Sequence, residues 1–214
     1  MRGVPRLVLA SASPRRRELL EMLALDFVVR PADLDETRRR GEAAEAYVSR
    51  LARAKAAHRV AAGECVLAAD TSVVLGEEIL GKPRDRAEAE TMVGRLAGRT
   101  HRVLTAVAVA HQPAPGRGGV APERQAADEV ATTEVTFCTM TRREISWYAG
   151  TGEGLDKAGA YAVQGIGALF VERLVGNYTN VVGLPLPVLA RCLRRIGLDL
   201  LTWRHPAVAV GAER

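Results

Sequence analysis

The chain has 214 residues, of which 48% are hydrophobic and 26% are charged, and its formal net charge is +5. This length and composition predict a soluble globular protein with one large domain or two small lobes, and they exclude a disordered or fibrous chain. The positive charge permits an anionic partner, but only 4% of the residues are aromatic. The stacking surface of a single-strand nucleic-acid binder is therefore not expected.

Cysteine usage and hydropathy indicate a cytoplasmic protein. Cys65, Cys138 and Cys192 are odd in number, far apart and inside apolar runs, a pattern typical of reduced thiols and not of disulfides or a zinc site. No apolar run approaches the length of a membrane span, and no hydrophobic signal segment follows Met1 and Arg2. We therefore expect neither a membrane nor a secreted location.

The first segment resembles a phosphate-binding helix terminus. Residues 7–9 predict a short buried strand, and residues 18–25 have the periodicity of an amphipathic helix. Ser13 is a suitable N-cap, with Pro14 at the first helical position. Arg15, Arg16 and Arg17 then lie in the first turn, where unpaired N–H groups and the helix dipole are already positive. These cations favour a bound anion, although a solvated basic face fits the same residues equally well.

Two further elements supply charged side chains. After a short strand at 26–31 comes an acidic loop that includes Glu36, which is either solvated or part of a metal or base site if it has partners. The alanine-rich run at 42–62 predicts a long helix. Val48, Leu51, Ala52 and Lys55 lie on one stripe of it, so Lys55 points with the apolar face and requires an anion or a path to solvent.

Residues 64–71 predict a buried strand that continues to residue 76, and Asp70 interrupts its apolar run. Burying a carboxylate is costly, and the ends of such strands are frequent ligand sites, so a functional role for Asp70 is favoured over a turn. Lys82 follows, held extended by Pro83. Asp85 or Arg86 then opens a helix that runs to about residue 96.

The second half predicts an antiparallel hairpin and a glycine-rich segment. Strands at 103–110 and 129–140 flank a mobile loop at 111–128, and Thr141 caps a helix. The glycine-rich segment at 150–167 allows close approach of a ligand or acts as a flexible linker. A strand at 169–175, a tight turn at 176–177 and a last helix to about residue 196 follow, with a poorly ordered tail from Trp203.

Five motifs stand in order between residues 7 and 193: Ala10-Ser11-Ala12-Ser13-Pro14-Arg15-Arg16; Ala69-Asp70-Thr71; Gly81-Lys82-Pro83; Asp156-Lys157-Ala158-Gly159-Ala160-Tyr161 with Gln164-Gly165; and Val181-Val182-Gly183-Leu184-Pro185-Leu186. Together they resemble the Maf-like nucleoside triphosphate pyrophosphatases. The resemblance implies hydrolysis of a nucleoside triphosphate between its α- and β-phosphates, which gives the monophosphate and pyrophosphate, with a divalent cation, Mg²⁺ or Mn²⁺, as cofactor.

The resemblance also implies roles for nine residues. Asp70 matches the general base, and Glu36 and Asp70 would hold the metal. Ser11, Arg16, Glu36, Lys55 and Lys82 match the polar cluster around the triphosphate. Arg15, Thr71 and Gln164 match the positions that select the base, and here they resemble the dTTP and UTP subgroup. Ala12 stands where relatives often carry glycine, and the 111–128 loop resembles an insertion that could alter a dimer surface.

The sequence thus predicts an α/β fold, with a mixed twisted β-sheet and flanking helices in two lobes around a nucleotide-binding cleft. Residues 1–200 are expected to form one domain and residues 201–214 a tail. The expected function is house-cleaning hydrolysis of pyrimidine nucleotides, with possible homodimers and no stable nucleic-acid complex. Two alternatives remain open: a purine pyrophosphatase of the inosine-triphosphate type, and a non-catalytic regulator of septum formation that binds nucleic acid or a protein.

Overall fold

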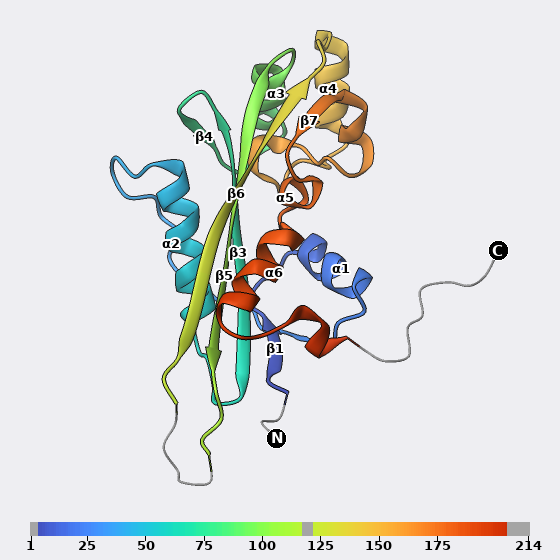
Figure 1. The fold of residues 1–214 in the computed structure, drawn as a ribbon. Helices are drawn as coiled ribbons and strands as arrows, with labels where there is room; N and C mark the ends of the chain where they lie inside the picture. The colour runs from blue at the N-terminus through green and yellow to red at the C-terminus, as the bar shows by residue number, and fades with distance from the viewer. Residues whose placement is uncertain (1–3, 117–121, 205–214) are drawn as a thin grey trace, which may run out of the picture.

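The computed structural model describes residues 4–116 and 122–204. A seven-stranded mixed sheet forms its centre, in the order β2-β1-β3-β5-β6-β7, with β4 paired to β3 (Figure 1). The strands are β1 (Arg6–Leu9), β2 (Val28–Val29), β3 (Glu64–Leu75), β4 (Glu78–Leu80), β5 (Thr100–Gln112), β6 (Gln125–Phe137) and β7 (Val171–Val175). Strand β1 is parallel to β2 and β3, and the other pairs are antiparallel, which confirms the predicted mixed α/β class.

In the described ranges, six α-helices and three short 3₁₀ turns surround the sheet. They are α1 (Pro14–Met22), α2 (Ala44–Ala57), α3 (Arg86–Leu96), α4 (Arg142–Gly150), α5 (Tyr178–Val182) and α6 (Leu186–Arg195), with η1 (Ala158–Ala160), η2 (Gly165–Phe170) and η3 (Leu200–Trp203). Helix α2 covers one face of the sheet, whereas α1 and α6 cover the other (Figure 1). None of the helices in the described part of the chain has the length and hydropathy that a membrane span requires.

The alternation of side chains along β3 divides the core into two layers. Leu67 and Ala69 pack in the cluster that contains the apolar residues of α1 and α6. Val66 and Ala68 pack in the cluster beneath α2. Because successive side chains of a strand point to opposite faces, residue 70 is directed toward α2 and residue 71 toward α1.

A third apolar cluster forms the second lobe. It lies at the far end of the long β5–β6 hairpin, where α3 and α4 pack with Phe137 and Phe170. The chain returns from this lobe through β7 and α5, and then enters α6 on the first lobe. The two predicted lobes are therefore halves of one continuous sheet, and the first has an apolar cluster on each face whereas the second has one cluster.

Several predicted boundaries are corrected. The helix predicted at 42–62 is α2, which ends at Ala57, because His58 already has extended backbone angles. The loop predicted at 111–128 is shorter, since β5 continues to Gln112 and β6 begins at Gln125. Its central residues 117–121 lie outside the described part. The strand predicted at 169–175 begins only at Val171, after the 3₁₀ turn η2.

The C-terminal boundary also differs from the prediction. Trp203 belongs to η3 and is buried in the first lobe, where its indole N–H donates a hydrogen bond to the Pro5 carbonyl. An aromatic ring of this size stabilises the fold by removing apolar area from water. The predicted poor order at Trp203 is thus wrong, and the packed chain extends past the boundary placed at residue 200. Residues 205–214 lie outside the described part.

The thiols agree with the expected reduced state. Cys65 and Cys192 are buried and Cys138 is half-buried, and all three are free. Burial raises the pKa of the Cys65 thiol to about 12 and that of Cys192 to about 11. Both are therefore protonated and unreactive at neutral pH.

One buried imidazole makes the fold sensitive to acid. His101 is 2% exposed, its Nε2 lies 2.8 Å from the Tyr161 hydroxyl, and its Nδ1 has no hydrogen-bond partner in the described structure. Burial lowers the pKa of His101 from 6.5 to about 4. As the pH falls below 6.5, this imidazole becomes protonated in the unfolded chain but stays neutral in the folded chain. The free energy of unfolding therefore declines until about pH 4.

We expect this group to contribute about 3 kcal/mol of stability at neutral pH that is lost across that interval. Denaturant unfolding followed as a function of pH measures the loss. His101→Gln keeps a polar group of similar size but does not titrate, so its free energy of unfolding should fall less steeply with acidification than that of the unchanged protein. Equal slopes would contradict the assignment.

Candidate functional site

A cleft of about 600 Å³ lies where the two lobes meet, over the middle of β3. Its walls come from the start of α1, the loop before α2, the end of β4, the glycine-rich segment and the C-terminal end of α5. All nine residues predicted for the site line it: Ser11, Arg15, Arg16, Glu36, Lys55, Asp70, Thr71, Lys82 and Gln164. Residues up to 153 positions apart in the sequence, from 11 to 164, thus face one cavity.

Asp70 and Lys55 form the buried centre of the site. The Lys55 ammonium lies 2.7 Å from an Asp70 oxygen and 2.7 Å from a Glu36 oxygen. Asp70 and Lys55 are each 7% exposed, whereas the Glu36 side chain is half exposed at the mouth. The apolar stripe of α2 explains why Lys55 points inward, and the alternation of β3 explains why Asp70 meets it.

Burial and charge act in opposite directions on the Asp70 carboxyl. Burial raises its pKa above the ordinary value, and the attraction and hydrogen bond of Lys55 together with the charge of Arg16 oppose that rise without cancelling it. The carboxylate is thereby a stronger base than an exposed aspartate, which suits proton abstraction from water near neutral pH.

The loop that carries Glu36 is anchored by a residue that the sequence analysis missed. The Tyr47 hydroxyl donates a hydrogen bond of 2.9 Å to the Glu36 carbonyl, and Tyr47 lines the cleft. Tyr47, Leu51 and Lys55 recur every four residues on α2, so they share a face of the helix. The spacing of eight residues between Tyr47 and Lys55 was the sequence pattern that could have placed Tyr47 in the site.

Arg16 ties the walls of the cleft together. Its guanidinium donates to the carbonyls of Gly183 (2.8 Å) and Ala69 (2.7 Å) and to the hydroxyls of Ser11 (3.1 Å) and Thr71 (3.2 Å). An arginine has five N–H groups, so four of them are used by the protein. Burial lowers the pKa of Arg16, although the charge of Asp70 opposes the shift.

The Arg16 contacts follow from local structure at both ends. Pro14 opens α1, and Ser13 occupies the predicted N-cap position, but its side chain makes no capping bond and its own N–H donates to Ser11. Gly183 caps α5 with a positive φ of 116°, a conformation that glycine adopts without strain. The first turn of α1 is therefore joined directly to the end of α5 by the Arg16–Gly183 hydrogen bond.

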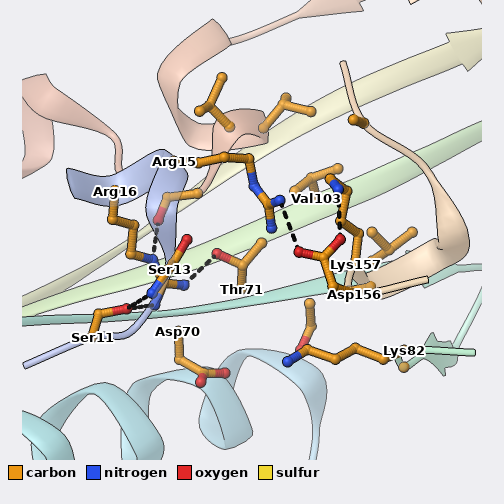
Figure 2. Close-up of a pocket in the computed structure, with 18 of the residues that line it drawn as sticks. Ser11, Ser13, Arg15, Arg16, Asp70, Thr71, Lys82, Val103, Asp156 and Lys157 are labelled. Carbon is orange, nitrogen blue, oxygen red and sulfur yellow. Dashed lines mark hydrogen bonds and ion pairs between the residues drawn. The ribbon is translucent and has the colours of Figure 1, made fainter. Parts of the chain in front are cut away.

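Arg15, from the same turn of α1 as Arg16, reaches toward three charged groups on the facing side of the cleft, Lys82, Asp156 and Lys157 (Figure 2). Arg15 lies 3.4 Å from Asp156, and Lys157 pairs with the same carboxylate. Burial raises the pKa of Asp156, but the hydrogen bond and charge of Lys157 and the charge of Arg15 outweigh this and leave the pKa below its usual value. Lys82 points into the cleft (Figure 2) and has no ion-pair partner among the described residues.

Asp156 and Lys157 belong to one of the five motifs but were not predicted as site residues. Both line the cleft, as do Ser72 and Tyr161. The Asp-Lys pair next to a glycine-rich run was the available signal for the first two. Nothing in the sequence indicated Ser72, which is 3% exposed beside Asp70.

The donor set suits a hard cation only in part. In the two described ranges, no group of three or more histidine, cysteine, aspartate or glutamate side chains could hold a metal ion. Glu36 and Asp70 supply two carboxylates at one end of the cleft. Mg²⁺ is commonly held by one or two carboxylates with water and substrate phosphates as the remaining ligands, so the pair fits a metal that binds together with a phosphate.

Comparison with known proteins gives one consistent set of relatives. Residues 6–196 match the family of Maf-like proteins. The chain is 53% identical over 202 residues to a dTTP/UTP pyrophosphatase of Anaeromyxobacter dehalogenans strain 2CP-1, covering 94% of this chain and 99% of that protein. It is 55% identical to the dTTP/UTP pyrophosphatase of Myxococcus xanthus, covering 92% and 95% of the two chains.

A more distant relative carries the same name. The dTTP/UTP pyrophosphatase of Symbiobacterium thermophilum is 45% identical over 198 residues, which cover 92% of this chain and 96% of that protein. Among solved structures, a HAM1 protein from Coxiella burnetii covers 61% of this chain and 73% of its own, with a TM-score of 0.35 and 18% identity. That likeness is too low to support an argument.

The four Arg16 hydrogen bonds predict a large loss of stability when the guanidinium is removed. In Arg16→Met, the carbonyls of Ala69 and Gly183 lose their donor, and the free energy of unfolding should fall by about 3 kcal/mol. Arg17→Met is the matched control, because Arg17 is exposed and its one ion pair with a described residue is with Glu21 in the same helix. The free energy of unfolding of Arg17→Met should differ from that of the unchanged protein by less than about 0.5 kcal/mol. Denaturant unfolding measures both, and equal losses would contradict this role of Arg16.

Proposed function

The chain belongs to the family of Maf-like proteins, and from this premise we propose that it is a nucleoside triphosphate pyrophosphatase whose preferred substrates are dTTP and UTP. The names of its relatives support the reaction and the substrate class. The observation that carries the proposal is that one cleft holds a buried carboxylate, Asp70, a buried lysine, Lys55, and a second lysine, Lys82, that has no ion pair with any described residue. A binding module has no need of a buried base.

The proposed reaction needs one base and several cations. The Asp70 carboxylate takes a proton from a water molecule, whose oxygen attacks the α-phosphorus. The bond from that phosphorus to the bridging oxygen breaks, and pyrophosphate leaves with the electron pair. Lys55 keeps the buried carboxylate ionised, because its ammonium contacts Asp70 directly. Its second contact, with Glu36, fixes the two carboxylates beside each other.

Lys82 and Arg15 are the proposed phosphate ligands. Phosphoryl transfer depends mainly on positioning and on neutralising the charge of the phosphate oxygens. Lys82 has no competing partner among the described residues, and Arg15 is held only by a long contact to Asp156. The N–H groups of the first turn of α1 face the same space and favour an anion. Arg16 and Ser11 are engaged with each other, so we assign them mainly to the shape of this wall.

A divalent cation, Mg²⁺ or Mn²⁺, is the proposed cofactor. Glu36 and Asp70 would hold it jointly with the triphosphate, and it would neutralise charge that develops on the phosphate oxygens. Lys55 would remain between the two carboxylates and limit their mutual repulsion.

Arg15, Thr71 and Gln164 are the proposed base-selecting residues. Thr71 is held on the cleft floor, where its hydroxyl lies 2.9 Å from that of Thr105 and accepts from Arg16. Gln164 lines the cleft and makes no hydrogen bond to any described residue through its side chain. An amide with unused donors and acceptors can read the edge of a pyrimidine and reject bases that leave it unpaired.

We place this activity in the cytoplasm, where three unpaired thiols are stable. The proposed role is the removal of surplus or modified nucleotides by a chain that can form homodimers. A stable nucleic-acid complex is not part of the proposal, because the charged side chains gather around one cavity of about 600 Å³ and not along an extended surface.

The proposal predicts pyrophosphate release from dTTP and UTP by the purified protein with Mg²⁺, in preference to purine triphosphates. Asp70→Asn has nearly the same shape but cannot accept the proton, so kcat should fall by about 10²- to 10⁴-fold. A panel of nucleoside triphosphates with pyrophosphate detection measures both expectations.

Asp85→Asn is the matched control, since Asp85 caps α3 on the surface and lies outside the cleft. It should leave kcat unchanged. Near-normal turnover by folded Asp70→Asn would show that another group is the base. No turnover by the unchanged protein on any triphosphate would refute the proposed activity itself.

The raised pKa of Asp70 sets the acid limb of the pH profile. Because the base must be ionised, kcat/KM should fall as the pH drops through this pKa, with a midpoint above the ordinary value of 3.8. In Lys55→Met, the cation that opposes the rise is lost, so the midpoint should move to higher pH. Both proteins are assayed on the same substrate, so the titration of its phosphates affects both pH profiles equally and cancels in the comparison. A midpoint that moves down, or not at all, would contradict the assignment.

A further inference from the structure

The glycine-rich segment is organised around one carboxylate that the proposed reaction does not use. The Oε1 atom of Glu153 accepts a hydrogen bond of 2.8 Å from the N–H of Ile166. Its Oε2 atom accepts two bonds of 2.8 Å, from the N–H of Gly167 and from the hydroxyl of Tyr148. Three donors therefore converge on one side chain, and two of them belong to the main chain of η2.

Tyr148 connects Glu153 to the part of the segment that precedes Gln164. Its hydroxyl also accepts a hydrogen bond of 3.2 Å from the N–H of Ala162. The side chain is 1% exposed, and its ring packs against Phe170 with a centroid distance of 5.6 Å. The Tyr148–Glu153 pair thus holds the main chain at residues 162, 166 and 167, which lie on both sides of Gln164.

The glycines of the segment are required by this close packing. A Cβ atom on Gly165, where φ is +82°, would lie 2.2 Å from a Glu153 oxygen. A Cβ atom on Gly167 would lie 2.2 Å from the Ala162 carbonyl oxygen and 2.6 Å from the Tyr148 hydroxyl. The segment is therefore a tightly packed support, and the flexible-linker interpretation of its composition is wrong.

Gln164 depends on that support for its position. It precedes η2 with extended backbone angles, and its side chain reaches the cleft without a hydrogen bond to any described residue. No hydrogen bond between its side chain and a described residue fixes the amide, so its placement follows from the main chain on either side. Glu153 and Tyr148 do not line the cleft.

We propose that Glu153 and Tyr148 are positioning residues that aim the Gln164 amide at the base of the bound nucleotide, and so determine how strictly the base is selected. This inference rests on the proposed function, because it assumes that a nucleoside triphosphate occupies the cleft. Neither residue touches the substrate. Both act through the main chain on the two sides of Gln164.

Glu153→Gln tests the inference with an isosteric change. An amide has one accepting oxygen, so its NH₂ group must face an N–H of Ile166 or Gly167 in either orientation. We expect kcat/KM for dTTP to fall at least about tenfold, mainly through KM. The value for ATP, whose purine base is disfavoured in the proposed selection, should change less than about threefold. The preference for dTTP over ATP should therefore narrow.

Two further variants separate positioning from stability. Tyr148→Phe keeps the buried ring and removes only the hydroxyl, so it should also reduce the preference for dTTP over ATP. Glu172→Gln makes the same chemical change as Glu153→Gln on an exposed residue of β7, and it should alter neither the preference nor the melting temperature. Loss of folding in both Glu153→Gln and Tyr148→Phe would assign the pair to stability alone and overturn the inference.

A double-mutant cycle with Gln164→Ala identifies the route of the effect. If the pair acts through Gln164, then Glu153→Gln should cause no further loss of preference in the Gln164→Ala background. Additive losses, or an equal fall in kcat for every triphosphate, would overturn the inference while the unchanged protein still released pyrophosphate. Absence of pyrophosphate release by the unchanged protein would instead refute the proposed function, so the two failures are distinguishable.

Discussion

The alternation of side chains along β3 is the constraint on which the site depends. Asp70 and Thr71 are adjacent in sequence but point to opposite faces of the sheet. Asp70 therefore meets Lys55 of α2, whereas Thr71 meets Arg16 of α1. A register shift of one residue would exchange these partners and place a carboxylate beneath α1. The extensive pairing of β3 with β5, from Glu64 to Val74, prevents such a shift.

Charge is buried here only where an opposite charge or several hydrogen bonds offset the loss of water. Lys55 has two carboxylates within 2.7 Å, and Arg16 has four oxygen partners. Lys82 is different, since it has no such partner among the described residues and remains exposed. The site thus combines a rigid, neutralised floor with a free cation at its entrance, which is the arrangement that a polyanionic substrate requires.

The sequence predicted which side chains line the cleft better than it predicted the elements that carry them. Lys55 and Asp70 were found because a charge on an apolar stripe needs a partner, and that signal is local. Glu36 could not be paired with Lys55 from the residues themselves, because a loop has no periodicity. The prediction made β5 too short, since its outer ends are not uniformly apolar, and it placed β6 too late, at 129–140 instead of Gln125–Phe137. Trp203 was assigned to a poorly ordered tail, because its contact with Pro5 near the other end of the chain leaves no local pattern.

The glycine-rich segment shows why composition alone is ambiguous at such sites. Glycines permit flexibility, but they also permit a main chain to approach another group closely, and only the neighbours decide between the two. Here the neighbours are Glu153 and Tyr148. The Asp70–Lys55 pair therefore lies on β3 and α2, whereas Gln164 lies on a separately supported glycine-rich segment. Such a division allows substitutions in that segment to change base preference while the Asp70–Lys55 pair stays intact.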